Sequence, residues 1–171
     1  MRKNSSVRNM AFAAVIAAVY AVLIVALPVP QYGGIQVRFA EALTILPFFF
    51  PAATPGLFVG CIIANMFSPF PLDILFGSLA TLVACMWTQR MPNRWLAPLP
   101  PVICNAVIIG FEVAWATTGL TNAFWPAYAL NAFTVGFGEL LACYGLGSIL
   151  ISAISRSTFF RDRMDIGRRT A

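Results

Sequence analysis

Residues 35–47 read IQVRFAEALTILP, and they place a cation, Arg38, three residues before a carboxylate, Glu41. Residues three apart lie on one face of a helix, so this pair can interact once a helix forms. Long apolar runs stand on both sides of the stretch. An ionised side chain within apolar segments is costly and is a functional candidate by default. The stretch therefore predicts a polar site inside an otherwise apolar helical protein.

The composition indicates an integral membrane protein. Of the 171 residues, 60% are hydrophobic and 10% are charged, against about 45–50% and about 25% in soluble domains. A soluble domain of this size could not cover so much apolar surface, and apolar runs long enough for membrane helices recur. We predict an all-α membrane protein with one integral membrane domain over residues 1–171.

Six apolar segments predict a bundle of six transmembrane helices. They cover residues 10–27, 42–50, 56–67, 72–87, 102–118 and 132–155, with a charge-free connection at 117–131. The first is expected to be a retained helix and not a cleaved signal. An even number of spans puts all three basic regions, residues 1–9, 90–94 and 156–171, on one face. That face is cytoplasmic by the positive-inside rule, so both termini are predicted to be cytoplasmic.

The basic clusters and the cysteines have plain interpretations. Each basic cluster flanks an apolar segment, so membrane lipid is the expected partner and nucleic acid is not. The chain has no histidine and no metal-type spacing of cysteines, so we expect no metal and no cofactor. The cysteines, which lie far apart within apolar runs, are expected to pack as small apolar residues: Cys61, Cys85, Cys104 and Cys143.

The predicted topology places the acidic residues before the tail toward the outside. Asp73 begins the fourth span, Glu112 lies about 9 Å below the outer end of the fifth, and Glu139 lies about 12 Å into the sixth. With Arg38 and Glu41, they are expected to converge on one level and line an outward-facing small-molecule site. One arginine cannot neutralise four carboxylates, which argues against purely structural charge pairs. Asn65 and Asn105 are weaker candidates for the same site.

An excess of acids suits a ligand that is cationic or rich in N–H donors. A carboxylate can accept two parallel hydrogen bonds from an amidine-like edge, as in guanine-type bases. Candidate stacking residues are Tyr32, Phe39, Phe111 and Trp115. No phosphate-binding loop is present and no nucleophile has a histidine to activate it. We therefore predict that the chain is not an enzyme, and that any uphill transport needs an ion gradient or a partner ATPase.

Small residues recur four apart in the first span, at Ala13, Ala17 and Ala21. Such a stripe lets two membrane helices approach closely. Two interpretations stay open: packing within the protein's own bundle, and docking on a separate membrane partner.

Three stretches resemble the signature of the QueT family of queuosine-precursor transporters. They are QVRFAEALTILP (residues 36–47), PAATPGLFVGC (51–61, continuing to Asn65) and LDILFGSLATL (72–82). The resemblance covers nearly the whole chain and implies the substrate-binding (S) component of an energy-coupling factor (ECF) transporter in the cell membrane. It implies a multi-pass protein that captures a 7-deazaguanine base from outside. It also implies docking on an ECF coupling transmembrane subunit that carries two ATPase subunits.

The resemblance gives the candidate residues provisional roles. One of the four carboxylates would accept hydrogen bonds from the base, and Arg38 would orient a carboxylate or contact the carbonyl. The alanine stripe resembles the docking surface of S components. Two alternatives remain open: an S component for another vitamin, and a membrane scaffold or channel-like subunit whose charges are structural pairs.

Overall fold

The computed structural model describes residues 2–27, 29–32 and 36–156, and every regular element within them is helical. In chain order the elements are α1 (Arg2–Ala26), η1 (Phe39–Ile45), α2 (Leu46–Phe49), α3 (Ala53–Asn65), η2 (Pro71–Ile74), α4 (Phe76–Thr88), α5 (Leu99–Thr118), α6 (Phe124–Leu140), η3 (Leu141–Leu146) and α7 (Gly147–Arg156). The predicted all-α class is confirmed. Much of the basic tail lies outside the described residues.

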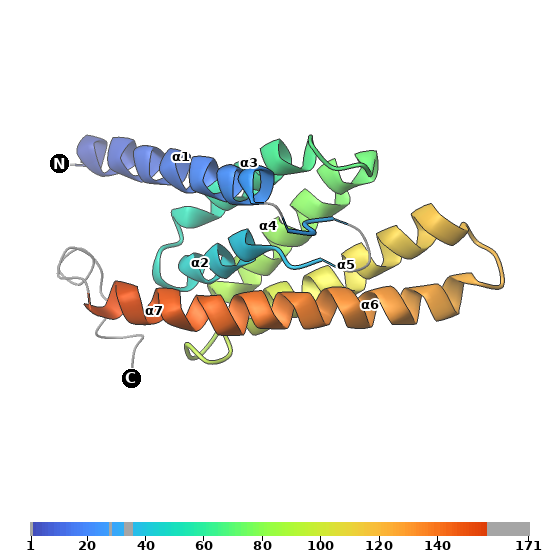
Figure 1. The fold of residues 1–171 in the computed structure, drawn as a ribbon. Helices are drawn as coiled ribbons and strands as arrows, with labels where there is room; N and C mark the ends of the chain where they lie inside the picture. The colour runs from blue at the N-terminus through green and yellow to red at the C-terminus, as the bar shows by residue number, and fades with distance from the viewer. Residues whose placement is uncertain (1, 28, 33–35, 157–171) are drawn as a thin grey trace.

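Four helical stretches are long and apolar enough to cross a membrane. They are Ser6–Ala26, Pro71–Thr88, Leu99–Thr118 and Phe124–Ile154, the last being the continuous run of α6, η3 and α7 (Figure 1). Two shorter apolar helices cover Phe39–Phe49 and Ala53–Asn65. Each of the six predicted segments thus contains helix, while the number of full crossings stays a prediction.

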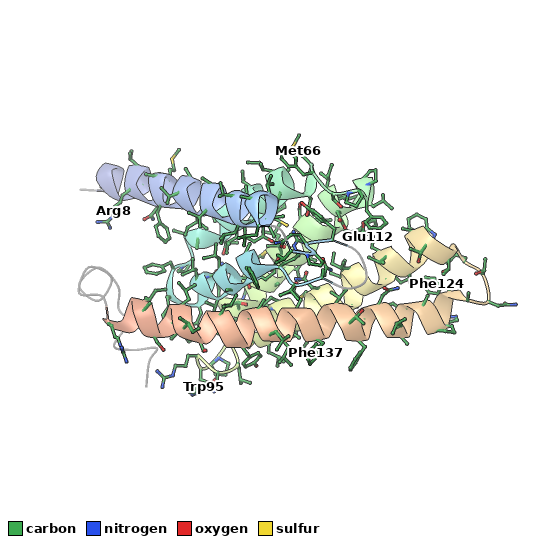
Figure 2. All side chains as sticks on the ribbon, in the orientation of Figure 1. Arg8, Met66, Trp95, Glu112, Phe124 and Phe137 are labelled. Atoms are coloured by element: carbon green, nitrogen blue, oxygen red, sulfur yellow. The ribbon has the colours of Figure 1, made fainter. Side chains whose placement is uncertain are left out.

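The start of α1 and the end of α7 lie at the same end of the bundle (Figure 1). Arg8 lies at this end as well (Figure 2). The turn between α5 and α6 lies at the opposite end. We call these the terminal end and the turn end. The arrangement agrees with termini on one side, and the assignment of that side to the cytoplasm stays a prediction.

Helices α1 and α3 pack closely because α3 carries glycines where it meets the alanine stripe. A Cβ added at Gly60 would lie 2.7 Å from the carbonyl oxygen of Ala17, and one added at Gly56 would overlap the carbonyl of Ala13. Ala17 and Ala21 are consequently buried, and Ala13 is partly buried. Packing within the bundle therefore accounts for Ala17 and Ala21.

Helix α6 begins eight residues before the predicted start of the last span, so the connection predicted at residues 117–131 is shorter and covers only 119–123. Pro126 looks like a helix breaker, but it falls in the first turn, where a helix needs no N–H donor. Aromatic packing fixes this turn: the Phe124 ring lies 5.2 Å from Phe111 and 6.2 Å from Tyr128, between centroids. Similarly, α5 begins at Leu99 and accommodates two prolines in its first turn.

The earlier start of α6 changes the depth of Glu139. Glu112 lies about 9 Å before the end of α5, whereas Glu139 lies about 22 Å after the start of α6. A Cβ added at Gly110 would meet Ala132, which shows which turns of the two helices lie side by side. In this register Glu112 and Glu139 are separated by about 13 Å along the bundle. The expectation that the acids share one level was wrong, because Glu112 and Glu139 lie at different depths along the bundle.

Candidate functional site

All seven predicted site residues are buried, each with at most 4% of its surface exposed. They come from the segment before η1, from η1 itself, and from α3, η2, α5 and α6: Arg38, Glu41, Asn65, Asp73, Asn105, Glu112 and Glu139. The structure thus brings residues from six parts of the chain into one interior. Whether they bind a ligand stays a prediction.

Arg38 links the parts of this polar cluster. Its Nε lies 3.8 Å from Glu41 Oε1, the one ion pair among the described residues. Its Nη2 donates a hydrogen bond to Asn65 Oδ1 at 3.0 Å, and Asn65 Nδ2 donates to the backbone carbonyl of Asp73 at 2.8 Å. The Tyr20 hydroxyl donates to Glu41. Arg38 therefore connects η1 with α3 and η2 while pairing with one of the four carboxylates.

The remaining charged and amide residues form two groups on either side of Arg38. The inner group is Glu41, Asn105 and Glu139, and the outer group is Asp73 and Glu112. In the inner group, the Asn105 amide lies beside the carboxylates of Glu41 and Glu139. Gly138 lets α6 pack closely against the segment before η1, because a Cβ at this position would overlap the carbonyl oxygen of Gln36.

In the outer group, the carboxyls of Asp73 and Glu112 lie against each other. Ser68 donates a hydrogen bond to Asp73 Oδ2. No described residue donates a hydrogen bond to the Glu112 carboxylate. The two acids therefore differ, because Asp73 accepts a hydrogen bond and Glu112 does not.

Several buried polar atoms of the cluster have no hydrogen-bond partner among the described residues. They are both carboxylate oxygens of Glu112, Glu41 Oε2, Asn105 Nδ2, Gln36 Nε2, Arg38 Nε and Ser78 Oγ, together with the side-chain amide of Gln31. Native proteins leave few buried polar groups unpaired, since each costs about 1–3 kcal/mol. Such a concentration is typical of a place that a ligand or water fills. Glu112 and Gln31 are the extreme members, because neither side-chain polar atom of either residue has a hydrogen-bond partner among the described residues.

Glu112 also forms part of the wall of a cavity of about 320 Å³ near the turn end. The other lining residues are apolar: Phe76, Phe111, Trp115 and Leu120. This volume lies at the lower end of ligand pockets, about 300–1,000 Å³, which are mostly apolar with a few polar groups. Figure 2 shows Glu112 inside the bundle, with Phe124 nearer the tip of the α5–α6 turn. The cavity can take a flat ring between aromatic side chains, while both Glu112 carboxylate oxygens are buried behind its wall and must turn toward the cavity to reach a ligand.

The four predicted stacking residues separate into two pairs. Phe111 and Trp115 line the cavity with Glu112. Tyr32 instead lies beneath the Arg38 guanidinium, 5.8 Å from its ring centroid, and donates a hydrogen bond to the Ala64 carbonyl at 2.7 Å. Burial raises the pKa of the Tyr32 hydroxyl. Phe39 is half-buried and lines none of the described cavities.

Sequence reasoning missed four members of the cluster: Tyr20, Gln31, Gln36 and Ser78. Tyr20 carried a usable signal, because a tyrosine within an apolar span needs a partner for its hydroxyl. Gln36 stands two residues before Arg38 in the stretch IQVRFAEALTILP, so its position also indicated the site. Ser78 gave no such signal, since small polar residues are common in membrane helices.

These features define a class: membrane proteins of apolar helices with a polar cluster buried in the interior and a cavity beside it. The chain belongs to the QueT transporter family, whose model matches residues 10–156. This is a family of transporters and not of enzymes, so the predicted family and the predicted lack of enzymatic activity are confirmed.

One curated relative adds detail. Over 83 residues the chain is 34% identical to the queuosine precursor transporter QueT of Lactococcus lactis subsp. cremoris (strain MG1363). The alignment covers 47% of this chain and 49% of the relative, so the chain spans about half the length of the curated relative that it matches. No solved structure matches the chain.

Proposed function

We propose that this protein captures a queuosine precursor, a 7-deazaguanine base, at the outer face of the cell membrane. It would do so as the multi-pass substrate-binding component of an ATP-driven importer of the ECF type. Family membership and the name of the lactococcal relative support the substrate. The importer type follows from the resemblance to S components and from the lack of a phosphate-binding loop in the sequence.

The observation that carries the proposal is Glu112, which lines the apolar cavity and whose two buried carboxylate oxygens accept no hydrogen bond from any described residue. The edge of a guanine-type base presents adjacent N–H donors, which match the two acceptors of a carboxylate. The rings of Phe111 and Trp115 supply flat apolar surfaces for such a base. A structural charge pair would explain Arg38 and Glu41 but would not account for Glu112, which lies against the carboxyl of Asp73 and not against a cation.

Mass spectrometry of small molecules retained by the protein tests this proposal. The protein is purified in mild detergent from cells supplied with the base, and its bound fraction is released by denaturation. We expect a 7-deazaguanine base at up to one molecule per chain. A different vitamin in the bound fraction would favour the S component for another substrate. If neither kind of molecule is bound, the alternative of a membrane scaffold or channel-like subunit would be favoured.

We further propose that the coupling subunit docks on a groove between α1 and α3. The groove holds about 570 Å³ and is lined by small and apolar residues, among them Ala13, Ala14, Ala17, Pro55, Gly56 and Val59. It retains part of the predicted alanine interface, whereas Ala21 is covered from within the bundle and does not line it.

The docking proposal predicts that Ala14→Leu blocks co-purification of the coupling subunit. Ala14 is exposed and lines the groove, so a larger side chain would fill it without entering the α1–α3 contact. The matched control is Ala18→Leu, because Ala18 is exposed on the same helix and does not line the groove. Pull-down from membranes measures partner recovery, and ligand binding should be unchanged in both variants. Equal recovery with Ala14→Leu would rule out this groove.

A further inference from the structure

A smaller cavity lies on the flank of the bundle, between the α4–α5 loop and the η3–α7 part of the continuous helical run of α6, η3 and α7. It holds about 150 Å³ and is lined by Arg94, Trp95 and Pro98 from the loop and by Tyr144, Ser148 and Ser152 from η3 and α7. This volume is too small for a drug-sized ligand but is equivalent to about five water molecules. It is a suitable size for a compact polar group.

Arg94 is the distinctive residue of this cavity, because it is a partly buried cation without an anion. No carboxylate lies within ion-pair distance of Arg94 in the part of the chain that the structure describes. Its guanidinium lies over the Trp95 ring, 5.2 Å from the centroid. Asn93 Oδ1 accepts the backbone N–H groups of Trp95 and Leu96 at 3.1 and 2.9 Å, which fixes the loop. The cation is therefore held in place, and its guanidinium donates no hydrogen bond to another residue that the structure describes.

The cavity offers an anion few donors besides Arg94. Ser148 and Ser152 donate their hydroxyl hydrogens to carbonyls of their own helix, at 2.8 and 2.9 Å. These hydroxyls present lone pairs, which do not attract an anion. Arg94 therefore supplies the charge, and the Tyr144 hydroxyl is a further donor in the cavity lining.

The surroundings favour an anion that belongs to the membrane. Trp95 is 65% exposed and points away from the bundle (Figure 2), and exposed tryptophans are enriched at membrane–water interfaces. Leu96 next to it is also exposed. Basic pockets between membrane helices are typical sites for anionic lipid headgroups. We propose that Arg94 and this cavity bind the phosphate of an anionic membrane lipid.

Native mass spectrometry of the whole chain in mixed micelles tests the assignment, with phosphatidylglycerol and phosphatidylcholine as competing probes. At low salt we expect phosphatidylglycerol to bind about fivefold more tightly than phosphatidylcholine. Arg94→Gln should abolish this preference, and Arg94→Lys should keep most of it because the charge remains. The control is Arg90→Gln, because Arg90 is exposed, bonds to the Met86 carbonyl and does not line the cavity.

Two results would overturn the proposal. One is an undiminished preference in Arg94→Gln while the protein stays folded by thermal denaturation. The other is loss of bound phosphatidylglycerol on addition of millimolar inorganic phosphate at constant ionic strength, which would assign the cavity to a free anion.

Discussion

Replacing Arg38 by methionine is expected to destabilise the folded protein by about 3–5 kcal/mol, because it removes one partner of a buried ion pair. Arg38 is 4% exposed and is the only cation that contacts the cluster among the described residues. Methionine keeps much of the side-chain length, so lost packing is a small part of the effect. Glu41 would lose its countercharge and Asn65 its donor. Thermal denaturation in detergent should show a melting temperature lower by roughly 10 °C.

Two comparisons separate charge from packing in this experiment. Arg90→Met removes an exposed arginine and should leave the melting temperature nearly unchanged. The double variant Arg38→Met/Glu41→Gln removes both charges of the pair, so it should recover part of the lost stability. An unchanged melting temperature in Arg38→Met would mean that the Arg38–Glu41 pair does not stabilise the fold, and the account of a buried ion pair that links the cluster would be wrong.

Replacing Glu112 by glutamine is expected to weaken binding of a 7-deazaguanine base by about a hundredfold, with the fold intact. Hydrogen bonds to a charged group contribute about 1.5–3 kcal/mol, and glutamine keeps one acceptor while losing the charge. Stability should stay the same or rise, because the neutral amide no longer repels the Asp73 carboxylate beside it. Isothermal titration measures the affinity, and thermal denaturation measures the stability.

The control for this variant is Thr117→Val near the end of the same helix. Thr117 is exposed, donates within α5 and does not line the cavity. Its replacement should change neither affinity nor melting temperature appreciably. If Glu112→Gln unfolds the protein or binds the base normally, Glu112 is structural and the scaffold interpretation gains support.

Much of the fold could be predicted because its signals are local. Hydrophobic runs located the helices, and prolines marked several of their ends. The same reasoning failed where a proline lay in a first helical turn, at Pro126, since composition does not distinguish a loop from a helix start. That error moved Glu139 by about two helical turns in the predicted depth.

The candidate site could be predicted only as a set of residues. Charged and amide side chains in apolar segments are conspicuous, and all seven predicted residues are buried. Their partners depend on contacts between distant segments, such as Tyr20 with Glu41. The division into inner and outer groups depends on how α5 and α6 align, which a glycine contact between the helices fixes. No periodicity in the sequence records that alignment.

The most direct measurement is a cycle of titrations that pairs the wild type and Glu112→Gln with two ligands. The ligands are 7-deazaguanine and 7-deazahypoxanthine, which lacks only the exocyclic amine. We expect the wild type to favour 7-deazaguanine by at least about a hundredfold, because its site is built to accept from that amine. The preference should fall below about tenfold in Glu112→Gln. Equal affinity of the wild type for both bases, or an unchanged preference in the variant, would contradict the account.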